Sequence, residues 1–427
     1  MLLRFEVSNH RSIKEPVELS MIAVDEDRPS ARAFERLSER VLSIAGIYGP
    51  NASGKSNVLD ALAWLSAAVG RSLRTWEEVI PREPFKFDGW LERASTFELD
   101  MMVADVRHTY RLEVDDSAVI FEQLQSYPEQ RARTLLEREG MELSFRRGLK
   151  GLSGTRQLLT STTLALSAAA RFGEPEILNF RKSLEQIGLL GTRHRVPRWR
   201  EQSAGLGRTM RLFDTPSGEG RQGASDEEAA HLVNRETALT LLRFADLGIE
   251  DVEILEERLP DLFADLRGAR KRVRLIHRAA DQELPFELDE ESEGTRTWYH
   301  LIGPVLKALR TGQVLLFDEI DASLHPRLSA KLLELFQDPV TNPHGAQLVF
   351  TTHDTSLLNH LNRDEVWLTE KAAEGSTTLT ALAEFGGDRV RRSLNLERAY
   401  LQGRFGAVPE LDQQTLRRAL GMAAQED

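Results

Sequence analysis

A phosphate-binding pattern lies near the start of the chain. Residues 49–56 read GPNASGKS, which fits G-x-x-x-x-G-K-[ST] and follows the apolar run VLSIAGIY. A strand that feeds such a loop and then a helix leaves backbone N–H groups directed at one point, where the helix dipole also favours an anion. Gly49 and Gly54 allow close approach of the backbone, Lys55 can reach the β- and γ-phosphates, and Ser56 can ligate Mg²⁺. The pattern predicts a nucleotide site.

Two carboxylates end a second apolar run far downstream. Residues 313–321 read QVLLFDEID. A buried parallel strand of this kind delivers its acids to the carboxyl edge of the sheet, beside a phosphate loop. Asp318 would hold Mg²⁺, directly or through water, and Glu319 would orient or deprotonate the attacking water. An acidic turn after a strand is common by itself, and the phosphate loop is what favours the catalytic interpretation.

Two further motifs flank these acids in the sequence. Residues 347–358, QLVFTTHDTSLL, form an apolar strand with a polar end, where His353 could contact a γ-phosphate. Ser292, Gly294 and Thr295 belong to ESEGTRT, at the start of a predicted helix, where a hydroxyl and an unhindered backbone can bind an anion. A histidine at a strand end is usually structural, and S-x-G-T alone is a weak signal. Their order relative to the acids supports a functional role.

The elements that position these residues in the N-terminal part are mostly strands. Residues 1–24 predict two strands around a turn, and the polar segment 25–39 predicts a loop before the phosphate-loop strand. Helical spacing covers 57–70 and ends at a glycine. Three strands separated by Asp-rich turns are predicted in 84–125, with one more hairpin in 133–146. An antiparallel β part therefore lies beside the nucleotide-binding sheet.

A helical block separates the phosphate loop from its downstream partners. Residues 158–247 have helical character, and a Gly- and Arg-rich segment at 191–225 predicts an exposed loop. We therefore divide the chain into 1–150, the N-terminal half of an ATPase domain, 151–265, a helical insertion, and 266–427, the C-terminal half. The predicted fold class is α/β, a P-loop NTPase with a mixed sheet, an antiparallel β part and a helical insertion.

The composition limits the class of protein. A chain of 427 residues with 41% hydrophobic content can bury more than one core. The absence of cysteine excludes disulfides, thiolate zinc sites and a cysteine nucleophile, and it agrees with a reducing compartment. The start, MLLRFEVSNHRSI, lacks a long apolar core, and no apolar run approaches the roughly 20 residues that span a bilayer. We expect a cytoplasmic protein that makes no use of a membrane.

The net charge of −12 argues against a surface built mainly for nucleic acid. Two basic stretches nevertheless stand out, RHRVPRWR at 193–200 and RGARKRVRLIHR at 267–278. Either stretch could contact a phosphate backbone. Such runs more often form solvated faces or pair with the chain's own acids, so nucleic-acid binding stays open.

The order of the motifs resembles the ABC-class ATPases of the SMC/RecF-like branch. Within that branch the chain is similar to the bacterial defence-associated group of AAA family ATPases, which is related to OLD-family and abortive-infection ATPases and to the ATPase subunit of PARIS-type systems. FEVSNHRSI resembles the N-terminal strand pair of that family, DEIDASLHP its acidic strand and following loop, and NLERAYLQGRFGAVP its tail. The resemblance covers nearly the whole chain and implies an ABC-type fold.

The resemblance implies a nucleotide-binding role for the residues of the phosphate loop, which are Gly49, Pro50, Asn51, Ala52, Ser53, Gly54, Lys55, Ser56 and Asn57. It implies ATP and Mg²⁺ as cofactors, with Ser56 and Asp318 on the metal and Glu319 on the water. His353 would be the switch histidine. Arg11 lies where relatives carry a basic residue near the nucleotide.

The resemblance also implies that two subunits complete each site. Ser292, Gly294 and Thr295 would form the signature that contacts ATP bound to the opposite subunit, and 321–324 would line the dimer interface. The signature ESEGTR departs from the transporter form LSGGQ. The glutamine that couples metal to the insertion has no clear match, and Gln123 and Gln125 are the candidates.

Two functions follow from these expectations. The first is an ATPase that hydrolyses slowly, forms a homodimer unit or a higher homo-oligomer around ATP, and controls a separate effector protein in anti-phage defence. The segment after His353 is too short for an added nuclease domain, which makes a nuclease-like effector on another chain one candidate. The alternative is a RecF/SMC-like DNA-binding ATPase of DNA repair or maintenance. A transporter subunit is disfavoured by the long insertion and the divergent signature.

Overall fold

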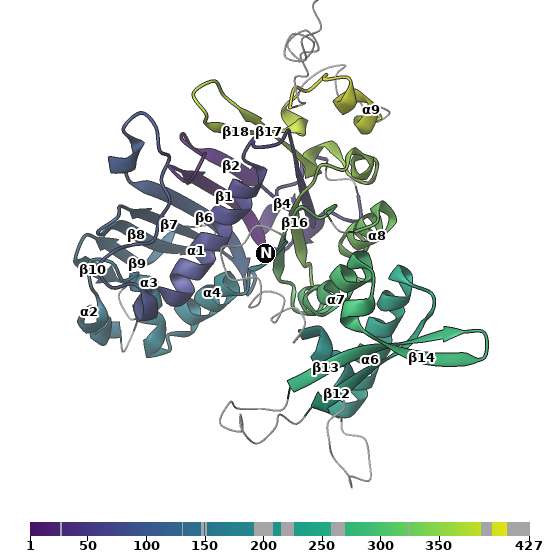
Figure 1. The fold of residues 1–427 in the computed structure, drawn as a ribbon. Helices are drawn as coiled ribbons and strands as arrows, with labels where there is room; N and C mark the ends of the chain where they lie inside the picture. The colour runs from purple at the N-terminus through teal and green to yellow at the C-terminus, as the bar shows by residue number, and fades with distance from the viewer. Residues whose placement is uncertain are drawn as a thin grey trace, which may run out of the picture.

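The computed structural model describes residues 1–25, 28–129, 131–146, 149, 152–191, 208–214, 226–257, 270–322, 324–385 and 395–407. Its largest sheets are one mainly parallel and one antiparallel sheet that contribute to a shared core (Figure 1). The fold is α/β with a mixed sheet, as the sequence predicts.

The six-stranded sheet carries the phosphate loop. Its strand order is β11 (Gly188–Gly191), β15 (Val314–Asp318), β16 (Gln347–Thr351), β5 (Ile44–Tyr48), β17 (Val366–Lys371) and β18 (Thr377–Ala381). Neighbouring strands are parallel, except that β17 and β18 form an antiparallel hairpin. Every residue of β5, β15 and β16 is buried, because helices or another sheet cover both faces.

Alternate residues of these strands enter two separate cores. Ala45 and Ile47 of β5 face a core shared with helix α1 (Lys55–Thr75) and the antiparallel sheet. Ile44 and Tyr48 face a second core. Helix α7 (Glu293–Thr311), helix α8 (Pro326–Gln337) and helix α6 (Asp226–Ala245) contribute to that core. The parallel sheet therefore lies between two unlike layers.

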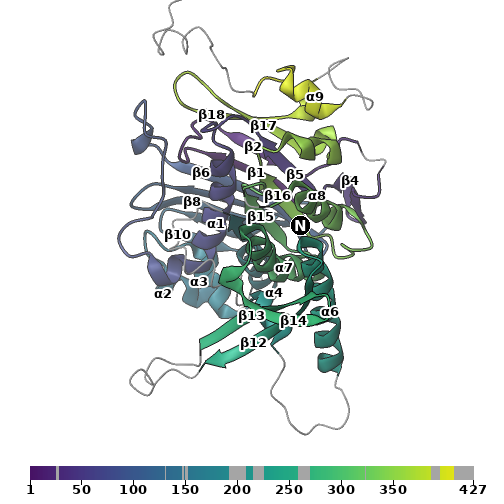
Figure 2. The ribbon, with the colours of Figure 1, turned by 45° about the vertical axis from the view of Figure 1, so that its right-hand side comes forward.

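The seven-stranded antiparallel sheet lies on the α1 side (Figure 2). Its strand order is β10 (Glu142–Phe145), β9 (Arg133–Glu139), β8 (Val119–Tyr127), β7 (Val106–Val114), β6 (Ser95–Val103), β1 (Leu2–Ser8) and β2 (Val17–Ser20). Helix α3 (Ala165–Ala169) and helix α4 (Pro175–Glu185) pack against α1 beside it. Both expected elements, the first strand pair and the later hairpin, are confirmed.

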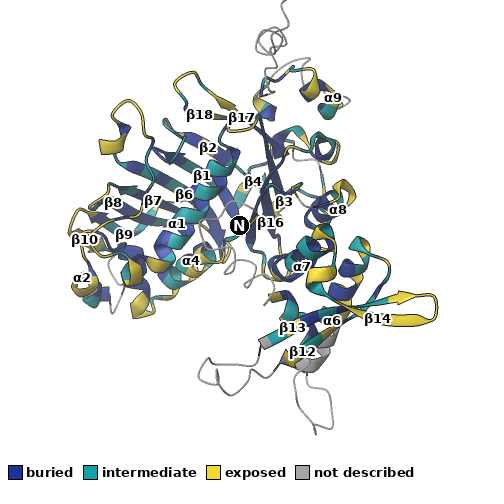
Figure 3. Ribbon diagram, viewed as in Figure 1, coloured by how far each residue is buried: buried dark blue, intermediate teal, exposed yellow. Residues whose placement is uncertain are grey.

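A small sheet accompanies the second core at the lower right of Figure 1. It comprises β12 (Ile249–Glu257), β13 (Arg270–Ala279) and β14 (Gln282–Glu287), all antiparallel. Helices α6 and α7 pack together here, and the Trp298 indole N–H donates to Leu241 O at 2.6 Å. Figure 3 shows β14 as an exposed strand next to these buried contacts.

The remaining elements are short. They are β3 (Arg32–Phe34), β4 (Leu37–Val41), α2 (Thr155–Leu158), α9 (Leu396–Leu401), and the 3₁₀ turns η1 (Trp90–Glu92), η2 (Leu152–Gly154), η3 (Ala170–Phe172), η5 (Leu288–Glu290), η6 (Thr355–His360), η7 (Arg363–Glu365) and η8 (Leu382–Glu384). Within the described residues, no helix has the length and apolar character needed to cross a membrane.

Three local predictions need correction. The segment 25–39, expected as a loop, contains β3 and most of β4. Helix α1 continues past Gly70 to Thr75, and beyond the glycine it buries Ser72, whose hydroxyl donates to Ser167 Oγ at 2.8 Å. The block expected to be helical contains β11, whose four residues GLLG are too few to show a strand pattern, and which pairs with β15.

Other predictions fall partly outside the described residues. Of the expected loop at 191–225, the structure describes 191 and 208–214, and 208–213 are helical. The basic stretch 193–200 lies outside the described residues. The division into 1–150, 151–265 and 266–427 stays a prediction.

Candidate functional site

The phosphate loop connects β5 directly to α1. Gly49 and Gly54 have φ of 149° and 104°, in the region that favours glycine, and α1 begins at Lys55. The Lys55 ammonium donates to Gly49 O at 2.9 Å and to Pro50 O at 3.0 Å, and the residue is 6% exposed. The lysine therefore lies across its own loop, with its charge at the centre of the predicted phosphate site.

Both glycines are also required by packing. A Cβ on Gly49 would lie 2.4 Å from Thr369 O, and a Cβ on Gly54 would lie 2.0 Å from Thr377 Oγ1. Thr369 and Thr377 belong to the β17–β18 hairpin. The hairpin thus lies directly against the phosphate loop.

The paired acids lie at the carboxyl end of β15, one strand away from β5. Asp318 is 3% exposed, and Glu319 has a φ of 57°. The Thr351 hydroxyl at the end of the intervening strand β16 donates to Asp318 Oδ1 at 2.7 Å and accepts from the Glu319 backbone N–H at 2.8 Å. Because Thr351 pairs with Ile47 of β5, the acids and the phosphate loop share one edge of the sheet.

The segment that carries His353 is fixed to the segment that follows the acids. The Thr352 hydroxyl donates to Asp321 Oδ1 at 2.7 Å, and the His353 backbone N–H lies 3.2 Å from both Asp321 carboxylate oxygens. The His353 residue itself is exposed. Asp321, expected in a loop of the dimer interface, therefore also orients the predicted switch residue.

The predicted signature forms an exposed helix start. The Ser292 hydroxyl caps α7 by accepting from the Thr295 backbone N–H at 3.1 Å, and it lies 2.8 Å from Thr295 Oγ1. Ser292 is exposed, Gly294 is half-buried and Thr295 is buried. The preceding residue, Glu291, contacts His277 Nε2 of β13 at 2.7 Å, which connects the small sheet to this helix start.

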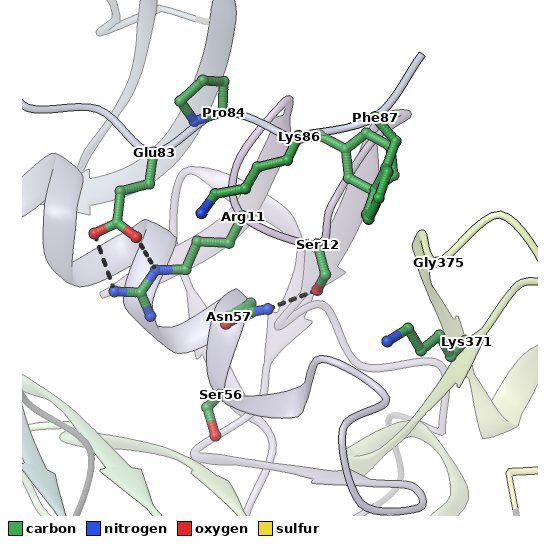
Figure 4. Close-up of a pocket in the computed structure, with 11 residues that line it drawn as sticks. Arg11, Ser12, Ser56, Asn57, Glu83, Pro84, Lys86, Phe87, Lys371 and Gly375 are labelled. Atoms are coloured by element: carbon green, nitrogen blue, oxygen red, sulfur yellow. Dashed lines mark hydrogen bonds and ion pairs between the residues drawn. The ribbon is translucent and has the colours of Figure 1, made fainter. Parts of the chain in front are cut away.

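A pocket of about 480 Å³ opens beside the phosphate loop (Figure 4). Its lining residues are Arg11, Ser12, Ser56, Asn57, Glu83, Pro84, Phe85, Lys86, Phe87, Lys371 and Gly375. The segments around Lys86 and Lys371 reach it from positions far apart in the sequence, so the sequence analysis missed both lysines. An aromatic side chain followed by a lysine carries no signal of a site when its neighbours are unknown.

Arg11 reaches the pocket wall with its guanidinium held by acids. Arg11 Nε lies 3.0 Å from Asp60 Oδ2 and 3.3 Å from Glu83 Oε2. Figure 4 shows the guanidinium directed at Glu83. A contact of Arg11 with nucleotide therefore stays a prediction, and it would require the side chain to leave these carboxylates or to share them.

The two candidate glutamines lie in the antiparallel sheet. The Gln123 amide donates to Glu137, and the Gln125 amide donates to Thr134 Oγ1 at 3.3 Å. Both partners belong to β9. These cross-strand contacts account for both side chains without a metal.

The described part of the second basic stretch pairs with the chain's own acids. Lys271 contacts Asp214 and lies 3.3 Å from Glu256 Oε1. Further along β13, Arg274 Nε lies 2.6 Å from Glu287 Oε1. These cations compensate acids on neighbouring elements, which fits a protein of net negative charge.

The C-terminal tail packs against the segment that follows His353. The Glu397 carboxylate of α9 accepts from Asn359 Nδ2 at 2.7 Å and from Thr355 Oγ1 at 3.3 Å. The Tyr400 ring lies 6.1 Å from the ring of Tyr48, the last residue of β5. Burial raises the pKa of Tyr400 to about 12, so its hydroxyl stays neutral and donates to Ala407 O.

The fold and the site together define a P-loop ATPase of the AAA/ABC type. A phosphate loop, a pair of acids one strand away and a polar segment after the intervening strand meet at one sheet edge. A family model described as "AAA domain, putative AbiEii toxin, Type IV TA system" matches residues 44–147 and 190–359, which is more than half of the chain. The chain belongs to this family.

Two of the solved structures with a similar course of the chain are SMC heads. One is the crystal structure of the SmcHead bound to the C-winged helix domain of ScpA. Its matching chain has 13% sequence identity to the present chain and a TM-score of 0.46, and the alignment covers 89% of the present chain and 97% of the matching chain. The SMC head domain from Thermotoga maritima is 14% identical, with a TM-score of 0.39, and covers 89% of this chain and 98% of that chain. No curated protein sequence matches the chain.

Proposed function

We propose that the chain binds ATP with Mg²⁺ and hydrolyses it slowly. The observation that carries this proposal is the position of Asp318 and Glu319 at the same sheet edge as the phosphate loop, with Thr351 bonded to both acids. Burying the Asp318 carboxylate costs free energy of desolvation, since a charged group loses its hydration in the interior. A metal ion bound beside Asp318 would offset this cost.

The donor set fits magnesium. The Ser56 hydroxyl and the Asp318 carboxylate are hard oxygen ligands, of the kind Mg²⁺ prefers together with phosphate oxygens and water. When bound, the metal would neutralise charge on the phosphates. The backbone N–H groups of the loop and Lys55 would hold the phosphates, and the pocket beside Asn57 would receive the nucleoside, with Phe87 and Lys371 at its walls.

Hydrolysis would proceed by attack of water on the γ-phosphorus. Glu319 would orient the water and take its proton while the new O–P bond forms and the bond to the leaving ADP oxygen breaks. Thr351 fixes the backbone N–H of Glu319, so the carboxylate starts from a defined position. His353 would contact the γ-phosphate side of the site.

We infer further that two copies complete each site. The signature start is exposed, and its serine, glycine and threonine are arranged around a helix N-terminus that favours an anion. ATP on one subunit would meet this helix start on the other, which gives a homodimer unit or a higher homo-oligomer. In this proposal the cytoplasmic ATPase controls a separate effector protein in anti-phage defence. The support for this setting is the family description, which names a putative AbiEii toxin of a type IV toxin–antitoxin system.

No specific observation favours the RecF/SMC-like DNA-binding alternative. The described cations of β13, including Lys271 and Arg274, face carboxylates of the same chain. DNA binding through this stretch would have to break those pairs. Stimulation of ATP turnover by duplex DNA, lost when Lys271 and Arg272 are neutralised and falling steeply with salt, would support the alternative.

The test of the proposed activity is a Glu319→Gln variant. We expect ATP binding to persist and phosphate release to fall by about 100-fold or more, since the variant loses the proton acceptor but keeps the loop. Phosphate release and equilibrium binding of a fluorescent ATP analogue measure the two effects. Glu334→Gln, on an exposed turn of α8, is the matched control. Unchanged turnover in Glu319→Gln with intact binding would remove Glu319 from the mechanism.

A further inference from the structure

A series of hydrogen bonds joins the β17–β18 hairpin to the phosphate loop. Thr377 Oγ1 lies 2.8 Å from Ser53 O, inside the loop, and 2.7 Å from Ser12 Oγ. Asn57 Nδ2 lies 2.6 Å from Ser12 Oγ. Thr377 is 3% exposed and its contact with Ser53 O is buried, whereas the two contacts of Ser12 are part-buried.

Each hydroxyl group has one proton to donate, and this fixes which group is the donor in each hydrogen bond of the series. The Ser53 carbonyl can only accept, so the single hydroxyl proton of Thr377 is used there. Ser12 must therefore donate to Thr377, and Ser12 in turn accepts from the Asn57 amide. From donor to acceptor, the series therefore runs from Asn57 to Ser12, then to Thr377, and ends at the carbonyl of Ser53.

A second, shorter series holds the other side of the loop. Thr369 Oγ1 lies 3.1 Å from Tyr48 O, which only accepts, and 2.6 Å from Ser53 Oγ. Ser53 must donate to Thr369. Ser53 is thus fixed through its carbonyl by Thr377 and through its side chain by Thr369, and it is 1% exposed.

The hairpin also determines where the loop can lie. A Cβ at Gly54 would come within 2.0 Å of the Thr377 hydroxyl oxygen, so Thr377 occupies the space that any other residue at 54 would need. The Thr377 backbone N–H donates to Ser12 O at 2.8 Å, which ties the hairpin to the turn that carries Arg11. Lys371 and Gly375 of the same hairpin line the pocket.

We propose that Thr377 is a positioning residue for nucleotide binding, which holds Ser53 and so directs the backbone N–H groups of the phosphate loop at the phosphates. The β17–β18 hairpin packs against the phosphate loop through Thr369 and Thr377, and its residues Lys371 and Gly375 line the proposed nucleoside pocket. This inference rests on the proposed function and deepens it, because it explains how the loop keeps its shape before the phosphates arrive.

The test compares Thr377→Val, which keeps the shape and removes the hydroxyl, with Thr377→Ser, which restores it. We expect the dissociation constant of ATP to rise about tenfold in Thr377→Val, since the Ser53 carbonyl and the Ser12 hydroxyl lose a buried partner. Thr377→Ser should return it to within about threefold of the wild type, because the same hydroxyl is available. Thr378→Val, at the exposed neighbour in β18, is the matched control.

A role in stability alone makes a different prediction. It would lower the melting temperature of Thr377→Val without weakening ATP binding by the protein that remains folded. Ser12→Ala interrupts the same series from the surface turn, so it should weaken ATP binding and add little to the effect of Thr377→Val in the double variant. This second variant keeps the test decisive if Thr377→Val does not fold.

The outcomes separate the inference from the function on which it rests. Wild-type affinity for ATP in Thr377→Val and in Ser12→Ala, with binding abolished in Lys55→Ala, would overturn the positioning role and leave the nucleotide site intact. Absence of ATP binding by the wild type would overturn both. Weakened binding in Thr377→Val, rescue in Thr377→Ser and no change in Thr378→Val would support the inference.

Discussion

The phosphate loop and the predicted signature helix start are both proposed to bind phosphate groups, but they are built in opposite ways. The loop is enclosed: Ser53 and Lys55 are buried, and Thr369 and Thr377 close it from behind. The signature serine is exposed and caps its own helix. The loop is thus enclosed by residues of its own chain, whereas the helix start carries an exposed serine.

This difference indicates whether the phosphate loop and the helix start each need a second copy of the chain. Contacts within one chain hold the loop, so a single copy should bind nucleotide through it. The proposed role of the helix start at Ser292 is to offer its dipole and a hydroxyl to ATP bound on another copy. The comparison therefore predicts that damage to the loop abolishes binding, while damage to the signature spares binding and affects assembly and turnover.

The largest effect is expected for Gly54→Ala. Its φ of 104° is strained for alanine, and the added Cβ would lie 2.0 Å from Thr377 Oγ1. We expect ATP affinity to fall by about 100-fold or more, because the loop must move off its phosphate-binding position. Equilibrium binding measures it. Gly140→Ala, which has a φ of 54° in the turn between β9 and β10 with open space around it, is the matched control.

An intermediate effect is expected for Thr351→Val, which tests whether strand β16 positions Asp318 and Glu319 through the Thr351 hydroxyl. The variant leaves the Asp318 carboxylate and the Glu319 N–H without their shared hydroxyl. We expect kcat to fall about tenfold while the dissociation constant of ATP changes less than about threefold. Thr351→Ser should restore kcat. An unchanged kcat in the valine variant would show that the acids do not depend on Thr351.

The smallest effect is a pH dependence within the signature helix. Burial, aided by Arg296, lowers the pKa of His300 on α7 below its ordinary value of 6.5. Because the unfolded chain binds the proton more readily, this group makes the free energy of unfolding fall as pH drops from 6.5 toward the lower folded value, and the effect levels off below it. The free energy of unfolding, measured with urea between about pH 5 and 8, should depend less steeply on pH in His300→Gln than in the wild type. An unchanged dependence of the unfolding free energy on pH in His300→Gln would contradict this prediction.

Local patterns identified the residues that lie at this sheet edge better than they identified the contacts around them. Lys55, Asp318 and His353 each follow an apolar strand, so a short stretch of sequence identifies them. Thr351 and Thr377 act through contacts between strands that are distant in the sequence, and a lone threonine at a strand end carries no such signal. The strand order that brings the acids beside the loop was predictable only as a fold class.

The same reason explains the elements that were missed. β11 has four residues, GLLG, and exists because β15 offers it a parallel partner. Lys86, in a loop, and Lys371, at the end of β17, meet at the pocket from segments that no local pattern connects. Tertiary pairing decided these features, and periodicity could not show them.

The central claim is that one copy supplies the phosphate loop and another supplies the signature. It is tested most directly by mixing two inactive variants, Lys55→Ala and Gly294→Asp. The carboxylate introduced by Gly294→Asp would place a negative charge where ATP of the other copy is expected. A carboxylate in the first turn of α7 also suits the helix dipole, so this variant should still fold.

Each variant alone should lack ATP turnover, and Gly294→Asp alone should still bind ATP. In an equimolar mixture, mixed dimers would contain one site with an intact loop and an intact signature, and we expect turnover to return to about one quarter of the wild-type rate if sites act independently and subunits exchange freely. Phosphate release from the mixture measures this. A mixture as inactive as its components, with mixed dimers shown to form, would contradict the shared site.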